Sequence, residues 1–138
     1  MDNTIMLIGN VTGDVDLVKT PGGSKVVNFS IAVTKYYDKE NKKWIADFFD
    51  CVAWNSLAEN IAASIKKGTR VIISGKLENN TWTDEEKKIR KSTRVNVSNI
   101  GPDLKFAVCS EIKKVKKDNE EDPAGEEDFA EKESSRYQ

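Results

Sequence analysis

Large aromatic rings and basic side chains occur together in the first part of this chain, and the combination is suited to binding a nucleic-acid strand. Aromatic rings stack on bases, while lysine and arginine neutralise phosphates. The rings that lie among lysines and arginines are Tyr36, Tyr37, Trp44, Phe48, Phe49, Trp54 and Trp82. We therefore expect a groove that stacks bases and follows a phosphate backbone.

Charge divides the chain into two parts. Residues 1–117 contain 20 Lys and Arg against 14 Asp and Glu, a formal net charge of +6. Residues 118–138 contain 2 against 9, a formal net charge of −7. The acidic part is too poor in apolar residues to order itself. It is predicted to be a separate, disordered tail that follows the folded part.

The composition argues against catalysis and against a metal site. The 138 residues include no histidine, which removes the usual general base, the imidazole metal ligand and every Ser-His or Cys-His arrangement. Cys51 and Cys109 form no CxxC motif, and buried free thiols are favoured over a disulfide. We expect no enzyme, no cofactor and no metal. Charges interrupt every apolar run, so we expect no membrane span and a cytoplasmic protein.

The pattern of the remaining residues predicts strands with one helix. The helix is expected over 56–67, with Ser56 and Glu59 as a capping box. Charged loops are expected over 35–43 and 79–91, a bulge or tight bend at Gly9 and a bulge at Gly75. Strands are expected over 4–11, 14–20, 25–34, 45–54, 70–78, 93–100 and 104–112. This order predicts an all-β domain with one helix, a five-stranded Greek-key barrel of the OB-fold type.

Two groups of residues are candidates for the groove. Trp82 has no apolar neighbour within four residues, and we expect its ring at the base of a mobile basic loop in which Lys87, Lys88, Arg90 and Lys91 follow phosphates. The alternative is a ring that folds back onto the domain. Phe48 and Trp54 share one face of a strand by the period of two, and this face is either a site or core.

Several segments resemble the bacterial single-stranded DNA-binding protein (SSB) family. The segments are Leu7–Val11, Val27–Ala32, Ser56–Asn60, Lys66–Gly68, Val71–Gly75 and Trp82–Asp84. The stretch Ile100–Ala107 resembles the actinobacterial branch. The resemblance covers about residues 3–112, which is most of the domain.

The resemblance implies an OB-fold that assembles as a homotetramer and wraps single-stranded DNA. By position, Trp82, Phe48 and Trp54 fall on stacking aromatics, Tyr37 on a ring beside a loop and Lys67 on a basic helix end. Asp50, Ser56 and Thr81 stand where relatives often carry basic residues. This departure shifts the expected phosphate contacts to Lys76 and to the 87–91 loop.

The predicted organisation is an OB-fold DNA-binding domain over 1–112 and a basic, then acidic, disordered tail over 113–138. Family members end in an acidic tip that docks replication and repair partners. Glu126–Phe129 imitates that tip and makes Phe129 the candidate partner contact, although nine residues follow it. We expect sequence-independent binding of single-stranded DNA in replication, recombination or repair, near the nucleoid. The alternatives are an OB-fold that binds RNA and an interaction adaptor that binds no nucleic acid.

Overall fold

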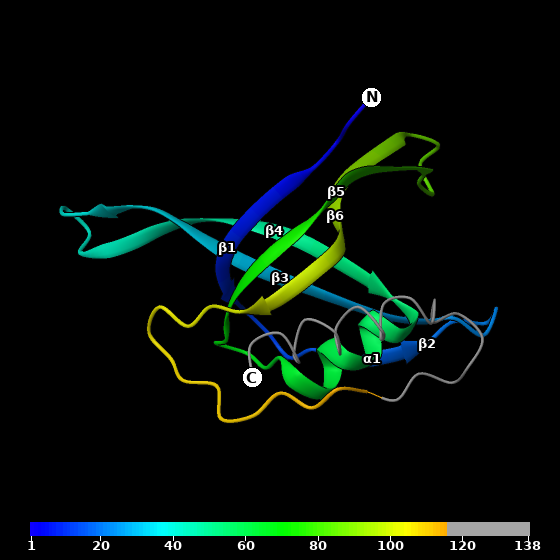
Figure 1. Ribbon diagram of the computed structural model, residues 1–138. Coiled ribbons are helices and arrows are strands. Elements are labelled where there is room, and N and C mark those ends of the chain that lie inside the picture. The colour runs from blue at the N-terminus through cyan, green and yellow to red at the C-terminus, as the bar shows by residue number, and fades with distance from the viewer. Residues whose placement is uncertain (116–138) are drawn as a thin grey trace. The chain divides into compact units, whose positions relative to one another are not determined.

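The computed structural model describes residues 1–115 and consists mainly of strands (Figure 1). One helix, α1 (Asn55–Ser64), lies between the fourth and fifth strands. The strands are β1 (Ile5–Val11), β2 (Leu17–Lys19), β3 (Lys25–Asp38), β4 (Lys43–Trp54), β5 (Arg70–Thr83) and β6 (Ile89–Pro102). No helix in this described part is long and apolar enough to cross a membrane.

Five of the strands close into a barrel. The sheet order is β1-β5-β6-β4-β3-β2, and β1 also pairs with β3 through Asn10–Ala32 and Val11–Ile31. The β4–β6 pairing is parallel, and the other pairings are antiparallel. The short strand β2 adds to the edge of β3 outside the ring. This arrangement confirms the predicted five-stranded OB-fold.

The core fills the barrel as the period of two predicts. Val27, Phe29 and Ile31 of β3 are buried, whereas Asn28 and Ser30 between them are not. Helix α1 contributes Ala58 and Ile61 to the same cluster, followed by Ile65 directly after the helix. Each buried Ile side chain contributes roughly 1.5–3 kcal/mol by leaving water. The barrel therefore supplies a rigid frame for whatever its outer side chains bind.

Two glycines allow the strands to approach closely. A Cβ at Gly9 would lie 2.5 Å from the Ala32 carbonyl oxygen, and one at Gly75 would lie 2.3 Å from that of Asn96. The register of β5 against β6 shifts between Ser74 and Gly75, so a bulge does form beside Gly75, but its extra residue is Ser98 of β6. At Gly9 the pairing of β1 with β5 continues without a register shift through Gly9–Val71 and Asn10–Arg70, and β1 also pairs with β3 from Asn10 onward, so no bulge forms at Gly9.

The helix begins and ends differently from the prediction. It ends at Ser64 rather than Lys67, and no side chain caps its N-terminus, so the capping box of Ser56 and Glu59 is wrong. Asn55 has a φ of 56°, and its side-chain oxygen accepts a hydrogen bond from the Lys25 backbone nitrogen. Glu59 forms an ion pair with the Lys25 ammonium group, so it is turned toward β3. Asn55 and Glu59 therefore contact β3 and do not cap the helix.

The two predicted loops are mostly strand. β3 and β4 stay paired as far as Asp38–Lys43, and β5 and β6 as far as Thr83–Ile89. Each charged segment is therefore a long hairpin with a short turn, which projects from the barrel in Figure 1. These strand segments could not be predicted from apolar alternation, because both faces of a projecting hairpin are in contact with solvent and can carry polar side chains.

The strand predicted over 104–112 is wrong, because β6 ends at Pro102, residues 103–115 contain no strand, and the alternating apolar side chains there are exposed and not packed in the core. The chain after β6 is held instead by Asp103, whose carboxylate lies 2.7 Å from Arg70 Nε. A compact unit covers Met1–Val108. Cys109 is exposed, contrary to the prediction, whereas Cys51 is buried as predicted and both thiols are free.

Candidate nucleic-acid interface

One surface of the barrel collects the residues that point away from the core, and we call it the outer face. The register of β3 and β4 defines it, because Ala32 lies opposite Phe48 and Asn28 opposite Val52. Parallel pairing of Val52 with Asn96 continues the face onto β6, and pairing of Asn96 with Lys76 continues it onto β5. Four adjacent strands therefore present alternate side chains to one surface.

Four exposed rings follow the β3–β4 part of the outer face. Phe48 and Trp44 are each 68% exposed, and Trp54, at the end of β4, is 37% exposed. Tyr37 lies opposite Trp44, and their rings meet edge to face at 5.1 Å. We call Tyr37, Trp44, Phe48 and Trp54 the aromatic row. Phe48 and Trp54 are therefore not core, although Val52 between them is buried.

A bulge brings Tyr37 into this row. The register of β3 against β4 shifts between Thr34 and Tyr36, so Tyr37 faces the same side as Trp44. Without that shift, alternation from Val33 would turn Tyr37 to the other side. Trp44 was not among the predicted site residues, because the segment before it was expected to be a loop. Trp44 is assigned to the row by its pairing with Tyr37 on β3, and the sequence alone does not show that pairing.

Trp82 lies on a strand of the second hairpin rather than in a mobile loop. It pairs with Arg90 across the hairpin and is 47% exposed. Because Lys76 is six residues earlier on the same strand, the two side chains share the outer face. The ring is thus available for stacking, as the sequence predicts, but a paired strand holds its position.

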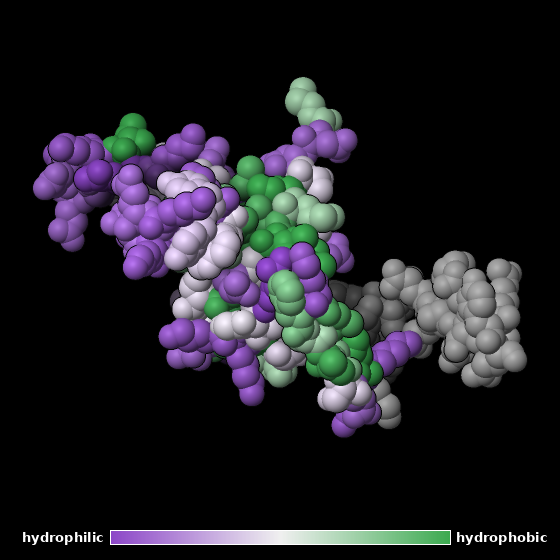
Figure 2. All heavy atoms as spheres, turned by 90° about the vertical axis from the view of Figure 1, so that its left-hand side faces the viewer, coloured by the Kyte–Doolittle hydropathy of each residue, from purple (hydrophilic) through white to green (hydrophobic). Residues whose placement is uncertain are grey.

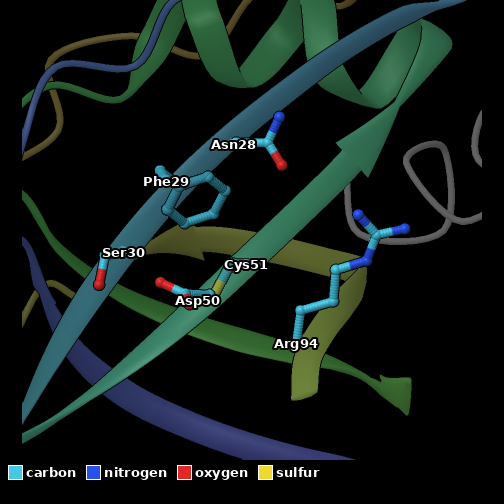
Figure 3. A pocket seen from close by; sticks show the side chains of 6 residues that line it. All are labelled: Asn28, Phe29, Ser30, Asp50, Cys51 and Arg94. Atoms are coloured by element: carbon cyan, nitrogen blue, oxygen red, sulfur yellow. The ribbon is translucent and has the colours of Figure 1, made fainter. Parts of the chain in front are cut away.

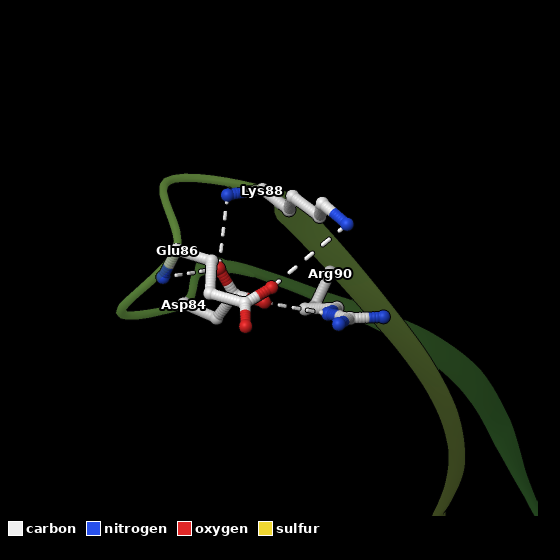
Figure 4. Close-up of polar contacts among 4 residues, drawn as sticks. All are labelled: Asp84, Glu86, Lys88 and Arg90. Carbon is white, nitrogen blue, oxygen red and sulfur yellow. Dashed lines mark hydrogen bonds and ion pairs between the residues drawn. The ribbon is translucent and has the colours of Figure 1, made fainter.

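The turn of this hairpin is closed by Asp84 (Figure 4). One Asp84 carboxylate oxygen accepts hydrogen bonds from the backbone nitrogens of Glu86 and Lys88, at 3.0 and 2.9 Å. The other oxygen lies 2.7 Å from Arg90 Nε. The Arg90 hydrogen bond, with help from these backbone donors, holds the pKa of Asp84 below its ordinary value. The predicted basic loop is therefore an ordered turn in which one arginine is already paired.

The predicted basic residues do not form one cluster. Lys67 lies in the turn after α1, and Lys76 lies on the outer face opposite Asn96. Lys87 occupies the tip of the hairpin with a φ of 63°, and Lys88 Nζ lies 3.8 Å from Glu86. Lys91 pairs with Thr81 and so faces away from Trp82. All five side chains are exposed, which leaves them accessible to a polyanion.

Polar residues that were not predicted occupy the outer face beside the aromatic row (Figure 3). Asn28 and Ser30 of β3, Asp50 of β4 and Arg94 of β6 line one hollow. Arg94 Nε lies 3.4 Å from Glu78, which also accepts a hydrogen bond from Asn96 at 2.8 Å. Beneath them, burial, with a contribution from Asp50, raises the pKa of the Cys51 thiol to about 12. That thiol stays protonated and takes no part in the chemistry of this surface.

An OB-fold with exposed rings and basic residues on its outer face defines the class of barrels that bind extended polymers across the sheet. A sequence model of the single-strand binding protein family matches residues 2–103. The single-stranded DNA-binding protein of Mycobacterium tuberculosis (strain ATCC 25618 / H37Rv) is 40% identical over 112 residues, covering 78% of this chain and 68% of that protein. The chain belongs to the single-strand binding protein family.

Other relatives come from related bacteria. The single-stranded DNA-binding protein of Mycolicibacterium smegmatis is 38% identical over 112 residues, covering 78% of this chain and 68% of that protein. That of Paenarthrobacter aurescens is 40% identical over 110 residues, covering 77% and 64%. These sources confirm the resemblance to the actinobacterial branch. The acidic run over 118–138, with Phe129, lies outside the residues that the structure describes.

Proposed function

We propose that this protein binds single-stranded DNA without sequence specificity and protects it during replication, recombination or repair. The observation that carries the proposal is the aromatic row, because solvent-exposed rings such as Trp44 and Phe48 are poorly explained by folding alone. Bases of any kind stack on aromatic rings, so a row of rings binds a strand regardless of its sequence. The relatives' names point to the same ligand.

The basic residues supply the second part of the binding energy. Lys67, Lys76, Lys87, Lys88, Arg90 and Lys91 neutralise phosphates and release counterions in this proposal. The strand stacks on Tyr37, Trp44, Phe48 and Trp54 along β3–β4 and on Trp82 of the second hairpin. This is a binding role rather than a catalytic one. It would keep the protein with single-stranded stretches of the bacterial chromosome.

Titration of the tryptophan fluorescence tests the proposal. Addition of a dT oligomer to the full chain should quench the emission, since three tryptophans lie on or beside the strand path. A U oligomer and a DNA duplex serve as comparisons, and both should bind more weakly. Equal or tighter binding of the U oligomer would favour the RNA-binding alternative. An unchanged spectrum with all three ligands would leave the interaction adaptor as the better explanation.

We also propose that the chain forms a homotetramer, as the family resemblance implies. An apolar patch supports assembly, since Met6 and Ile8 of β1 are 68% and 42% exposed and Ile72 lies directly opposite Ile8. Figure 2 shows apolar residues gathered across the middle of one face, between hydrophilic projections. Light scattering should give four times the chain mass, and Met6→Glu with Ile8→Glu should lower it. A monomer mass for the unaltered chain would contradict the assembly.

A further inference from the structure

We propose that Asp50 and Arg94 form a guanine-selective subsite within the single-strand path. The inference rests on the proposed function, because it assigns a base preference to one position of the same surface. A surface that binds phosphates is not expected to carry a negative charge in the middle of its binding path. Asp50 lies on the outer face between Phe48 and Trp54, and its carboxylate would repel a backbone laid against it. A strand stacked on this row must therefore turn base edges, and not phosphates, toward Asp50.

The Asp50 carboxylate has its full capacity to accept hydrogen bonds. Within residues 1–115 it makes no hydrogen bond and no ion pair, and its side chain is exposed. Arg94 faces the same hollow but lies beyond ion-pair distance of Asp50. Arg94 turns Nε to Glu78, which leaves its two terminal nitrogens without an acceptor in this part of the chain. An acceptor and a double donor thus border one space without satisfying each other.

The space beside them fits a base ring. Asp50 and Arg94 also line a second hollow of about 390 Å³, which falls within the range of small-ligand sites. Its remaining lining is mainly apolar, from Ile5, Phe48, Phe49, Leu77, Thr93 and Val95. A planar base can therefore rest against Phe48 and the aliphatic side chains, with its polar edge directed at the two charged groups. Few polar groups around an apolar hollow are the usual means of orienting a ligand.

The chemistry of the two charged groups selects guanine. A carboxylate accepts at two oxygens, and guanine alone among the bases places two adjacent donors, N1–H and the N2 amino group, on one edge. Adenine and cytosine place an acceptor beside their amino group, and thymine flanks its single N–H with two carbonyls. Arginine forms its commonest base contact with the O6 and N7 acceptors of guanine. Asp50 and Arg94 together are thus complementary to both edges of this base.

The preference is local and leaves the overall binding tolerant of sequence. Stacking along the aromatic row acts on every base, whereas the subsite acts on one nucleotide of the bound strand. A bidentate base contact discriminates by roughly five- to a hundredfold. Because Asp50 and Arg94 border open solvent, we expect the lower end of that range, about fivefold.

Oligomers that differ at one position test the subsite. Labelled dT oligomers carrying a single central dG, dA, dC or deoxyinosine are titrated into the full chain and followed by fluorescence anisotropy. The dG oligomer should bind about fivefold more tightly than all-dT. Deoxyinosine lacks the N2 amino group, so it should lose most of that advantage. Equal affinities for all the oligomers would overturn the subsite and leave the proposed function intact, whereas no binding of any oligomer would overturn both.

A matched pair of variants assigns the preference to Asp50. Asp50→Asn keeps the shape of the side chain but accepts at one oxygen only, so the ratio between dG and dT affinities should fall to about one. Asp47→Asn removes the same charge from the same strand, but Asp47 lies opposite Val33 on the other side. Both variants should bind all-dT slightly more tightly, because each removes a negative charge. An unchanged dG ratio in Asp50→Asn, or an equal loss in Asp47→Asn, would refute the assignment.

Discussion

The two long hairpins share a framework and differ in what they carry. Each turns around an aspartate that accepts two backbone hydrogen bonds, Asp38 from Glu40 and Asn41, and Asp84 from Glu86 and Lys88. The β3–β4 hairpin carries all four rings of the aromatic row. The β5–β6 hairpin carries one ring, Trp82, among polar side chains that are partly paired with each other. Both tips are basic, with Lys39, Lys42 and Lys43 on the first hairpin and Lys87 and Lys88 on the second, so the two hairpins differ mainly in the number of rings.

This division indicates how binding energy is distributed over the surface. A stack on an exposed ring is largely independent of salt, whereas neutralised phosphates give a binding constant that falls as salt rises. The β3–β4 hairpin should therefore set affinity at any ionic strength. The phosphate contacts of the β5–β6 hairpin should contribute to the binding free energy mainly at low salt.

Removing two rings from the β3–β4 hairpin should give the largest loss. Trp44→Ala with Phe48→Ala should cost about 2–6 kcal/mol of affinity for a dT oligomer, since each stack contributes a comparable amount and the two positions lie far enough apart to act independently. Anisotropy of a labelled oligomer measures the loss. Tyr36→Ala is the matched control, because Tyr36 is exposed but lies opposite Ile45 on the other side. A loss no larger than that from the control would remove the row from the binding path.

Trp82→Ala tests the single ring of the second hairpin and should cost about 1–3 kcal/mol of affinity. Thermal unfolding should change little, because the ring is about half exposed and fills no core position. Ile89→Ala is the control on the same hairpin, since Ile89 is exposed and pairs with Thr83 beside Trp82. A sharp drop in melting temperature with unchanged affinity would show that the ring packs against the domain instead.

The salt dependence of binding separates the basic residues of the β5–β6 hairpin. Lys76→Gln with Lys87→Gln should flatten the log–log slope by about 1.4, or 0.7 for each phosphate contact, because both side chains are exposed and neither forms an ion pair within residues 1–115. Lys88→Gln with Arg90→Gln should flatten it less, because these side chains already face Glu86 and Asp84. Titrations at several salt concentrations give both slopes. Equal changes in the two double variants would mean that the carboxylates release their partners when the strand binds.

Acidification should loosen both turns, with the smallest effect on binding. The pKa values of Asp38 and Asp84 lie below the ordinary 3.8, lowered first by hydrogen bonds from the Asn41 and Arg90 side chains. The carboxylate contacts therefore stabilise the turns above about pH 3.8 and are lost as the pH falls through the lower folded values. Amide chemical shifts of Glu40, Asn41, Glu86 and Lys88 report the change. Salt should weaken only the Asp84 turn, which contains an ion pair, and equal salt effects would contradict this difference.

Local pattern was sufficient to predict the barrel and to show that Phe48 and Trp54 share one side of a strand. Val27, Phe29 and Ile31 alternate with polar residues because one side of β3 meets the core, and that alternation is visible in the sequence. The same rule puts Phe48 and Trp54 on one side of β4 but leaves open whether that side is site or core, and the structure decides for an exposed side because Cys51 and Ala53 fill the other. Side-chain positions that depend on burial could therefore be predicted from the sequence.

Side-chain positions that depend on cross-strand partners could not be predicted from the sequence. A bulge near Lys35 decides the side on which Tyr37 lies, and the pairing with Tyr37 assigns Trp44 to the row. The predicted capping box does not form, and Glu59 instead forms an ion pair with Lys25, which is far from it in the sequence. The family resemblance marked Asp50 only as a departure from a basic position, because the role proposed for it depends on Arg94, which lies on β6. Each of these needs the register of neighbouring strands, which a single sequence does not contain.

The missing methyl groups at Gly9 and Gly75 carry a consequence for mutational tolerance. An alanine at Gly75 would press its Cβ into the Asn96 carbonyl oxygen, which belongs to the backbone and has no rotamer to change. β5 and β6 would have to move apart at this point of their pairing to admit it, and Trp82 lies seven residues farther along β5. A substitution far from any base would then misplace the ring without unfolding the core. In a saturation screen for binding, Gly75 should therefore rank with the aromatic positions, although it touches no ligand.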